Sequence, residues 1–467
     1  MRPVITPEDI VAADPGFFYN LTVGLRAGID CGTRCVEGES VNGVSGPPVP
    51  VRIITDAQRI YAVAPTVAEL ADLPGVNSLV VMYHQGRYLS RDYIEDPHQH
   101  AERLTDALAE MGREDLSGRV FPLHSLDAPT INAQLCSGGI AVLPNVRSHP
   151  DETDKYRGSN MPSRSDLIRT FEGVVDVVVA DDYSVRHRPS PSVVGWNVPL
   201  LCSLHMKDEV ASIEKLSSGY SSPTFWIVAG LKVDDYFDTL ESMLEAGKID
   251  RVLAGGGFAE LGLAVKGYEF GEGNAHLRDK GLIGDGPYQN DLNFQRMRML
   301  LGQHGDKIDL PMDLAVERDG RRADLKLGTP RGRVLSEPAC DIGHDTIGNY
   351  ISILRRGKPS MTFIKGPMGK YEDPRFVTGT REVLEAAVAH SGDVFLMGGN
   401  TNGAAELIGL PKEGYRSTLA GGAAMEGMTL ALRGRALPGV QALYATVERA
   451  LSGAYGETMQ RVAERVS

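Results

Sequence analysis

The most informative part of the sequence is KGPMGKYEDPRFVTGT, which runs from Lys365 to Thr380. The apolar run MTFI directly precedes it, so we expect a strand that passes into a loop rich in glycine and proline. The segment DVFLMGGNTNGAA, which begins at Asp393, repeats this order of strand, glycine turn and helix start. Backbone amides at such a helix start point outward and bind anions readily. This part of the chain therefore predicts strand–loop–helix units with anion sites at their turns.

The same alternation runs through the rest of the chain. The runs SLVVMY (Ser78–Tyr83), GIAVLP (Gly139–Pro144) and VVDVVVA (Val174–Ala180) are typical of buried parallel strands, and helical patterns separate them. A second set of strands begins with FWIVAGL at Phe225 and continues through IDRVLAGGG, KIDLPMDLAV, MTFIKG and DVFLMGG. Two successive sets of this kind predict the α/β class, with two doubly wound parallel-sheet (Rossmann-like) domains.

The length of 467 residues suits two domains. The segment LHMKDEVASIEKL has helical spacing and lies between the two sets of strands, so it predicts a connecting helix. We expect a first α/β domain at 1–203, a hinge helix at 204–222 and a second α/β domain at 223–435. The C-terminal segment, 436–467, is expected to pack back near the hinge.

Composition narrows the class of partner. The formal net charge of −13 argues against a nucleic-acid binder, and no apolar run approaches the roughly 20 residues that a membrane helix requires. The N-terminus lacks the basic and apolar segments of a signal peptide. The cysteines are scattered and odd in number, which is typical of reduced thiols: Cys31, Cys35, Cys136, Cys202 and Cys340. No second cysteine or histidine pair accompanies Cys31 and Cys35, so a zinc site is not expected. We therefore predict a cytoplasmic monomer without nucleic-acid or membrane partners.

Arginines and histidines follow the strands of the first half. They lie in four short strings: Arg59 in TDAQRIYAVAPT, His84 and Arg87 in YHQGRY, Arg147 in PNVRSH, and Arg188 in DDYSVRHRPSPSVVG. In open α/β sheets, ligands bind at the carboxyl ends of the strands, and guanidinium groups pair with phosphate and carboxylate oxygens. A surface salt bridge would explain any one of these arginines alone. The four together predict a binding site for a small polyanion.

These strings, in this order, resemble the phosphoglycerate kinase family. The stretch at Lys365 resembles the family's NGPMGVFE…F..GT, and the arginine strings resemble ITDxxRIxAxxPT, SHLGRP, ENLRF and NDAFGTAHRAHxSxVG. The resemblance runs from about Asp30 to the C-terminal region. It implies that 3-phosphoglycerate, the first candidate acid, is held by Arg59, His84, Arg87, Arg147 and Arg188, with Asp30 at its hydroxyl group.

The resemblance also implies a site for ATP or ADP with Mg²⁺ in the second half. AGLKVDDYFD, RVLAGGGFAELGLAVKGYEFG and FLMGGNTNGAA resemble the family's GGAKVSDKI, IIGGGMAFTFLKAxGxxxG and IIGGGDSVAA. The implied nucleotide-binding residues are Lys232, Gly255, Gly256, Gly257, Lys365, Glu372, Gly398, Gly399, Asn400 and Thr401. Lys232 matches the lysine that neutralises the transferring phosphoryl group, so Arg59 and Lys232 are the expected catalytic residues.

Several positions depart from the family's pattern. The second lysine of the GGAKVSDKI string is Tyr236 here, and the asparagine before GPMG is Lys365, a new cation near the phosphates. The family's acidic residue that helps to organise magnesium is Asn400, which supplies no negative charge, and the asparagine two residues after Asp30 becomes Gly32. We therefore expect Asn400 to be a weak metal contact, with the metal held mostly by the nucleotide phosphates.

The implied function is a phosphotransferase that moves a phosphoryl group between ATP and the carboxylate of a small phosphorylated acid, through an acyl phosphate. Domain 1–203 would bind the acid and domain 223–435 the nucleotide, with hinge closure to exclude water. Two alternatives remain open: an ATP-dependent ligase or specialised-metabolism carboxylate kinase with the same acyl-phosphate chemistry, and a non-catalytic metabolite-binding homologue. Trapping with hydroxylamine, amide formation, or binding without ADP release would separate the three.

Overall fold

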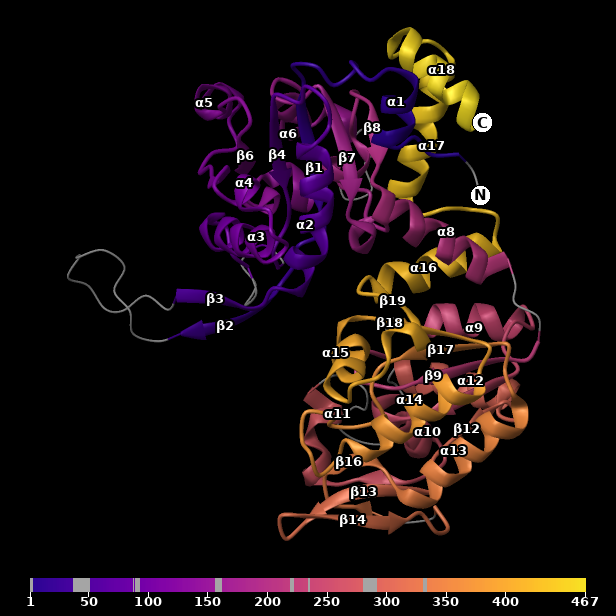
Figure 1. Ribbon diagram of the computed structural model, residues 1–467. Coiled ribbons are helices and arrows are strands. Elements are labelled where there is room, and N and C mark those ends of the chain that lie inside the picture. The colour runs from indigo at the N-terminus through magenta and orange to yellow at the C-terminus, as the bar shows by residue number, and fades with distance from the viewer. Residues whose placement is uncertain are drawn as a thin grey trace, which may run out of the picture. The chain divides into compact units, whose positions relative to one another are not determined.

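The computed structural model divides the chain into two compact units (Figure 1). Unit 1 comprises Met1–Ser212 and Ala436–Ser467, and unit 2 comprises Ile213–Arg435. Helix α8, Leu204–Ser218, carries the chain from the first unit to the second. The structure describes residues 3–36, 51–86, 88, 93–155, 162–218, 222–233, 236–279, 292–330 and 334–467. Within these ranges, no helix is both long and apolar enough to cross a membrane.

Unit 1 is built on a six-stranded sheet in the order β5-β6-β4-β1-β7-β8, and every neighbouring pair is parallel. The strands are β1 (Thr22–Ala27), β4 (Ser78–Met82), β5 (Val120–Pro122), β6 (Ile140–Val142), β7 (Val177–Asp181) and β8 (Leu200–Cys202). All residues of the three central strands β4, β1 and β7 are buried. Burial on both faces explains why these strands are continuous apolar runs instead of alternating ones.

Helices cover both faces of this sheet, and the C-terminal segment belongs to the same unit. They are α1 (Pro7–Ala13), α2 (Gln58–Ala71), α3 (His98–Glu110), α4 (Glu114–Ser117), α5 (Ala128–Gln134), α6 (Asp166–Glu172), α7 (Pro191–Val194), α17 (Pro438–Leu451) and α18 (Gly456–Val466). Helix α17 packs on β8 and α7, and α18 packs on α1. An antiparallel pair, β2 (Gly32–Val36) and β3 (Val51–Asp56), projects from the sheet.

Unit 2 repeats the architecture with a second parallel sheet, in the order β12-β10-β9-β17-β18-β19. Its strands are β9 (Thr224–Val228), β10 (Arg251–Ala254), β12 (Ile308–Asp309), β17 (Met361–Lys365), β18 (Asp393–Met397) and β19 (Arg416–Thr418). Phe363 of β17 lies between Trp226 of β9 and Phe395 of β18, with ring centroids 5.0 and 6.3 Å away. Two parallel-sheet α/β units confirm the predicted fold class.

The helices of unit 2 are α9 (Phe237–Glu245), α10 (Gly256–Val265), α11 (Ala275–Asp279), α12 (Leu292–His304), α13 (His344–Gly357), α14 (Thr378–His390), α15 (Gly399–Leu407) and α16 (Gly421–Leu432). Short strands β11 (Glu269–Phe270) and β15 (Val334–Leu335) pair in parallel. A three-stranded antiparallel sheet is formed by β14 (Arg321–Lys326), β13 (Asp313–Arg318) and β16 (Ala339–Ile342).

The run KIDLPMDLAV, expected as one strand of the main sheet, is divided between two sheets. Its first part forms β12 at the edge of the parallel sheet, and its second part forms β13 at the centre of the antiparallel one. Pro311 lies between them and has no N–H to continue a ladder, which gives the chain a place to change sheets.

The start of β13 is tied to the start of α13 by one carboxylate. Asp313 is 1% exposed and accepts hydrogen bonds from the backbone amides of Asp345 (3.0 Å) and Thr346 (2.8 Å). These amides belong to the first turn of α13, where helix N–H groups lack partners in the helix itself. The two strings LPMD and DIGHDT are therefore joined by this cap, although they are about thirty residues apart in the chain.

We expect the Asp313→Asn substitution to lower the free energy of unfolding by about 1–3 kcal/mol, because one amide then loses a charged acceptor. Urea unfolding followed by circular dichroism measures the change. Asp319→Asn is the matched control: Asp319 is exposed in the β13–β14 turn with φ 51°, a conformation that asparagine adopts readily. Equal stability of the two variants would show that the Asp313 cap contributes nothing.

Candidate active site

The sequence-predicted acid site lies at the carboxyl ends of the strands of unit 1. Asp30 follows β1, His84 follows β4, Arg147 follows β6, and Arg188 follows β7. Since β6, β4, β1 and β7 are consecutive parallel strands, their ends meet at one edge of the sheet. Arg59 comes from the first turn of α2. Arg87 lies outside the described residues.

The loops at this edge hold one another through hydrogen bonds. Gly86 N donates to Asp30 Oδ1 at 2.9 Å, and Arg147 donates to the carbonyl of Gly86. Gln85 exchanges two hydrogen bonds with the backbone of Cys31, at 2.7 and 2.8 Å. Asn145, fully buried, donates to the carbonyl of Gln85. The loops after β1, β4 and β6 therefore form one connected layer.

The orientation of His84 follows from its neighbours. Arg26 Nη2 lies 3.1 Å from His84 Nδ1, and a guanidinium can only donate, so Nδ1 accepts and Nε2 carries the proton. Nε2 faces Asp30 Oδ2 at 3.7 Å. The pKa of His84 lies well below its ordinary value because the ring is buried and because Arg26, Arg188 and Arg59 add positive charge around it. A neutral imidazole with a defined tautomer thus stands behind the Asp30 carboxylate.

A buried charge network underlies this layer. Arg26 is 1% exposed; its Nη1 lies 3.4 Å from Asp182 Oδ2 and its Nε donates to Ser192 Oγ at 3.0 Å. Arg186, also buried, forms an ion pair with Asp182. Burial raises the pKa of Asp182, and the two arginines act against that shift. A buried charge that lost its partner would cost several kcal/mol, so the network holds Arg26, and through it His84, in one position.

We expect unit 1 to lose stability as the pH falls below 6.5. The pKa of His84 is depressed in the folded state, and burial lowers the pKa of His100 to about 3. The unfolded chain therefore binds more protons below pH 6.5, and each buried histidine contributes a slope of about 1.4 kcal/mol per pH unit.

Urea unfolding between pH 7.0 and 5.5 measures this slope. His84→Gln should reduce the slope of the unfolding free energy against pH by the contribution of one histidine. His98→Gln, on the exposed face of α3, should leave the slope unchanged. A slope that is the same in all three proteins would contradict the assignment of a neutral His84. His205 contributes in the opposite sense above pH 6.5, because Asp181 raises its pKa to about 9, and this contribution is the same in all three proteins.

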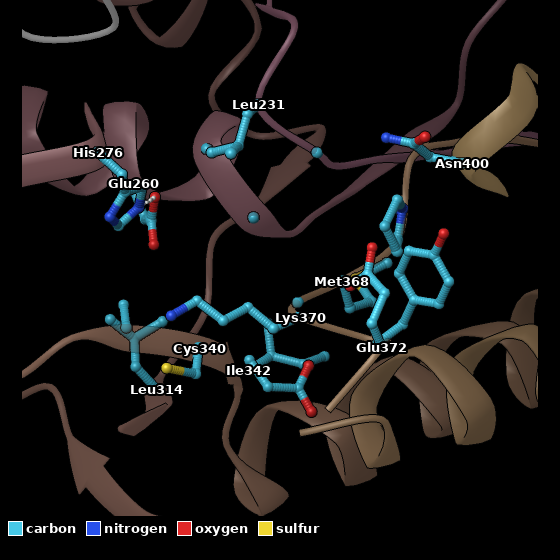
Figure 2. Close-up of a pocket in the computed structure, with 18 of the residues that line it drawn as sticks. Leu231, Glu260, His276, Leu314, Cys340, Ile342, Met368, Lys370, Glu372 and Asn400 are labelled. Atoms are coloured by element: carbon cyan, nitrogen blue, oxygen red, sulfur yellow. Dashed lines mark ion pairs between the residues drawn. The ribbon is translucent and has the colours of Figure 1, made fainter. Parts of the chain in front are cut away.

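The sequence-predicted nucleotide site of unit 2 is a cavity of about 450 Å³ (Figure 2). Its wall comes from the turn after β9, the start of α10, strand β16, the loop after β17 and the start of α15. Five of the predicted nucleotide-binding residues line it: Lys232, Gly256, Gly257, Glu372 and Asn400. The cavity is therefore formed by the loops that the KGPMGKYE and glycine-triplet strings predicted.

Two glycines allow the backbone turns of this wall to touch. Gly256 has φ 47°, and a Cβ there would lie 2.7 Å from Gly230 N. Gly366 has φ 89°, and a Cβ there would lie 2.9 Å from the same nitrogen. Any other residue would be strained in conformation and would also push the turns apart. Gly255, the N-cap of α10, packs under Met368.

The remaining predicted residues lie next to the cavity without lining it. Lys365 ends β17, and its ammonium would be 3.0 Å from a Cβ at Gly398 and 2.7 Å from a Cβ at Gly421. Gly398 is the N-cap of α15, and Gly421 begins α16. The Lys365 ammonium thus lies against the N-termini of two helices, where backbone dipoles favour an anion.

Thr401 and Tyr236 serve the internal packing of unit 2. The Thr401 hydroxyl accepts from Gly366 N and donates to Met397 O, both at 2.8 Å, and so joins β18 to the loop after β17. Tyr236 is 1% exposed and packs on Phe258 at 5.9 Å between ring centroids. A side chain buried in this way supplies no charge to the cavity.

The sequence prediction did not name five polar side chains of the cavity: Glu260, His276, Asp341, Lys370 and Tyr371. Glu260 occupies the position of a phenylalanine in the family segment GGGMAFTF, and Lys370 that of the valine in NGPMGVFE. These two departures were visible in the motifs themselves. His276 lies in α11 and matched no motif.

Comparison with known proteins shows the family. A family model described as phosphoglycerate kinase matches residues 47–430. The phosphoglycerate kinase of Methanococcus maripaludis is 28% identical over 85% of this chain and 92% of its own length, and that of Thermoplasma acidophilum is 30% identical over 79% and 85%. The crystal structure of phosphoglycerate kinase from Pyrococcus horikoshii OT3 superposes with a TM-score of 0.75 at 26% identity, over 92% of this chain and 98% of that one.

The fold and the matches define a two-unit α/β phosphotransferase, a kinase with a carboxyl group as acceptor. The chain belongs to the phosphoglycerate kinase family. The resemblance stated from the sequence motifs is confirmed.

Proposed function

We propose that this protein transfers a phosphoryl group between ATP and the carboxylate of 3-phosphoglycerate, with 1,3-bisphosphoglycerate as the acyl phosphate. One observation carries the proposal: a cavity of nucleotide size begins at Lys232 and the Gly256 turn in unit 2, while the arginines of unit 1 gather at the carboxyl edge of its sheet. Phosphoryl transfer needs in-line positioning and compensation of oxygen charge more than it needs covalent help.

The acid would be bound by Arg59, Arg147 and Arg188, together with Arg87 of the undescribed segment. Each guanidinium offers paired donors to phosphate or carboxylate oxygens. Asp30 would accept a hydrogen bond from the substrate hydroxyl, and His84 would hold that carboxylate in place through its Nε2 proton. Arg59 would also stabilise charge on the carboxylate that gains or loses the phosphoryl group.

The nucleotide would lie in the cavity of unit 2, with Glu372 at the ribose and Lys232 at the transferring phosphoryl group. Lys365 would supply the second cation in place of the lysine that Tyr236 replaces. The Lys365 ammonium lies against Gly398 and Gly421, at the N-termini of α15 and α16. Helix N-termini and a cation both favour negative oxygens, which supports a phosphate position beside Gly398 and Gly399.

The residues present fit a magnesium ion that arrives with the nucleotide. The described residues contain no group of three acidic, histidine or cysteine side chains able to hold a metal. Asn400 is exposed on the cavity wall in the first turn of α15 and offers one neutral oxygen. When bound, the ion would offset phosphate charge, and Asn400 would be its weak protein contact.

We also propose that the protein is a monomer in the cytoplasm and that its two units close about α8 before the reaction takes place. Closure would exclude water, which would otherwise hydrolyse the acyl phosphate. The four cysteines whose state is described are free thiols, as in reducing compartments. Light scattering tests the monomer, and scattering curves with and without both substrates test closure.

Arg147→Ala should raise the KM for 3-phosphoglycerate about ten- to a hundredfold, because one charge-assisted contact is worth about 1.5–3 kcal/mol. The KM for ATP should change less than about twofold. Arg119→Ala is the matched control: Arg119 also donates to a backbone carbonyl, that of Gly138, but at the amino ends of the strands. Steady-state kinetics with both substrates measures the change. An unaltered KM for the acid in Arg147→Ala would remove this edge as the acid site.

Lys365→Asn should lower kcat by at least about tenfold with little change in either KM, because the lysine acts on charge that develops during transfer. Gly421→Ala should lower kcat as well, since its methyl group would occupy the place of the Lys365 ammonium. Gly302→Ala, in α12 with open space around it, should behave as the parent. Normal turnover in both Lys365→Asn and Gly421→Ala would contradict this role of Lys365.

A further inference from the structure

One end of the nucleotide cavity carries polar side chains that take no part in the proposed phosphoryl transfer. Figure 2 shows Glu260 and His276 together at this end and Asn400 at the other, with the Lys370 side chain extended toward the Glu260 end. The fold separates the two ends: α10, which carries Glu260, follows β10, and α15, which carries Asn400, follows β18. Two strands lie between β10 and β18, which places the ends about 14 Å apart at ordinary strand spacing. That span suits a nucleotide with its phosphates at Asn400 and its base at Glu260.

One oxygen of the buried Glu260 carboxylate, Oε2, has no hydrogen-bond donor among the described residues. The residue is 5% exposed. Its described partner is His276, with Nε2 3.4 Å from Oε2. The neighbouring residues of α10, Phe258, Leu261 and Leu263, are core residues and need no carboxylate beside them. A buried carboxylate in this condition is costly unless a ligand donates to it.

Two side chains at the Glu260 end of the cavity, Lys370 and His276, can donate hydrogen bonds. Lys370 lies beside Cys340 and lowers the pKa of that thiol, although burial raises it overall. Its ammonium can only donate, and the His276 ring offers an N–H as well. This end of the cavity therefore presents the Glu260 carboxylate with the His276 ring beside it, and the Lys370 side chain extends toward the same end.

We propose that Glu260 reads the base of the nucleotide and that the cavity accepts guanine at least as well as adenine; this inference rests on the proposed nucleotide site. Guanine has two adjacent N–H donors, at N1 and N2, for the two carboxylate oxygens, and a carbonyl acceptor at O6 for the ammonium of Lys370. Adenine offers a single amino donor beside the N1 lone pair, so a carboxylate gains one hydrogen bond and faces a repulsive atom. Glu260 is thus a specificity-determining residue.

The test measures equilibrium binding of ADP, GDP and IDP to the full chain by isothermal calorimetry, without the acid. The parent should bind GDP at least as tightly as ADP, and IDP, which lacks the N2 amino group, about tenfold less tightly than GDP. Glu260→Gln should weaken GDP about tenfold, leave ADP within about twofold, and abolish the difference between GDP and IDP. Glu272→Gln, an exposed glutamate between α10 and α11, is the matched control and should leave all three affinities unchanged.

Tighter binding of ADP than of GDP by the parent would overturn the inference. An equal effect of Glu260→Gln on all three nucleotides would overturn it too, since Glu260 would then act on the fold or the general field. Transfer assays with ATP and GTP on 3-phosphoglycerate test the proposed reaction separately. If the protein prefers GDP but transfers no phosphoryl group, the proposed reaction is contradicted and the guanine inference stands. If it binds none of the nucleotides, both are contradicted.

Discussion

The nucleotide cavity depends on backbone contact between the ends of three neighbouring strands. The turns after β9, β10 and β17 meet at Gly230, Gly256 and Gly366, and the last two have positive φ and no room for a Cβ. This close approach lets the turn after β9, the start of α10 and the loop after β17 form one wall. The hydroxyl of Thr401 adds the fourth strand to this layer through Gly366 N. The positions of Lys232, Glu372 and Asn400 all follow from these contacts.

The edge of unit 1 is organised by charge instead of by close backbone contact. Arg26 lies below the loops, where Asp182 neutralises it, and it determines which nitrogen of His84 carries the proton. The arginines Arg59 and Arg188 add positive charge at this edge, and together with burial and Arg26 they depress the pKa of His84. Positive charge gathered at one edge of a sheet favours a polyanionic ligand, because guanidinium groups pair with phosphate and carboxylate oxygens.

In unit 2, the departures from the family's pattern form a connected set. Tyr236, which stands where the family has its second lysine, is buried in the core. Lys365, which ends a different strand, places a cation at the N-termini of α15 and α16. Asn400 has removed a negative charge close to that new cation. At the far end, Glu260 and Lys370 stand where the family strings have phenylalanine and valine, and His276 lies beside Glu260. These changes redistribute charge along the cavity while the backbone that shapes it stays the same, which is how one fold serves different ligands.

The fold class and the family could be read from the sequence, and the site residues could be proposed from it. Strands buried on both faces are continuous apolar runs, and turns that need glycine show it directly, so β4, β7 and the loop after β17 were predictable from local chemistry. The ordered arginine strings likewise predicted that these arginines lie together at one edge of one sheet. The partners of buried polar groups could not be predicted from the sequence, because they come from segments that are far apart in the chain. They are known from the three-dimensional structure. It revealed the Asp313 cap on α13, the division of KIDLPMDLAV between two sheets, and the tautomer of His84. It also placed Lys365 against Gly421, and Glu260 beside His276, since helices that follow different strands meet only when the sheet forms.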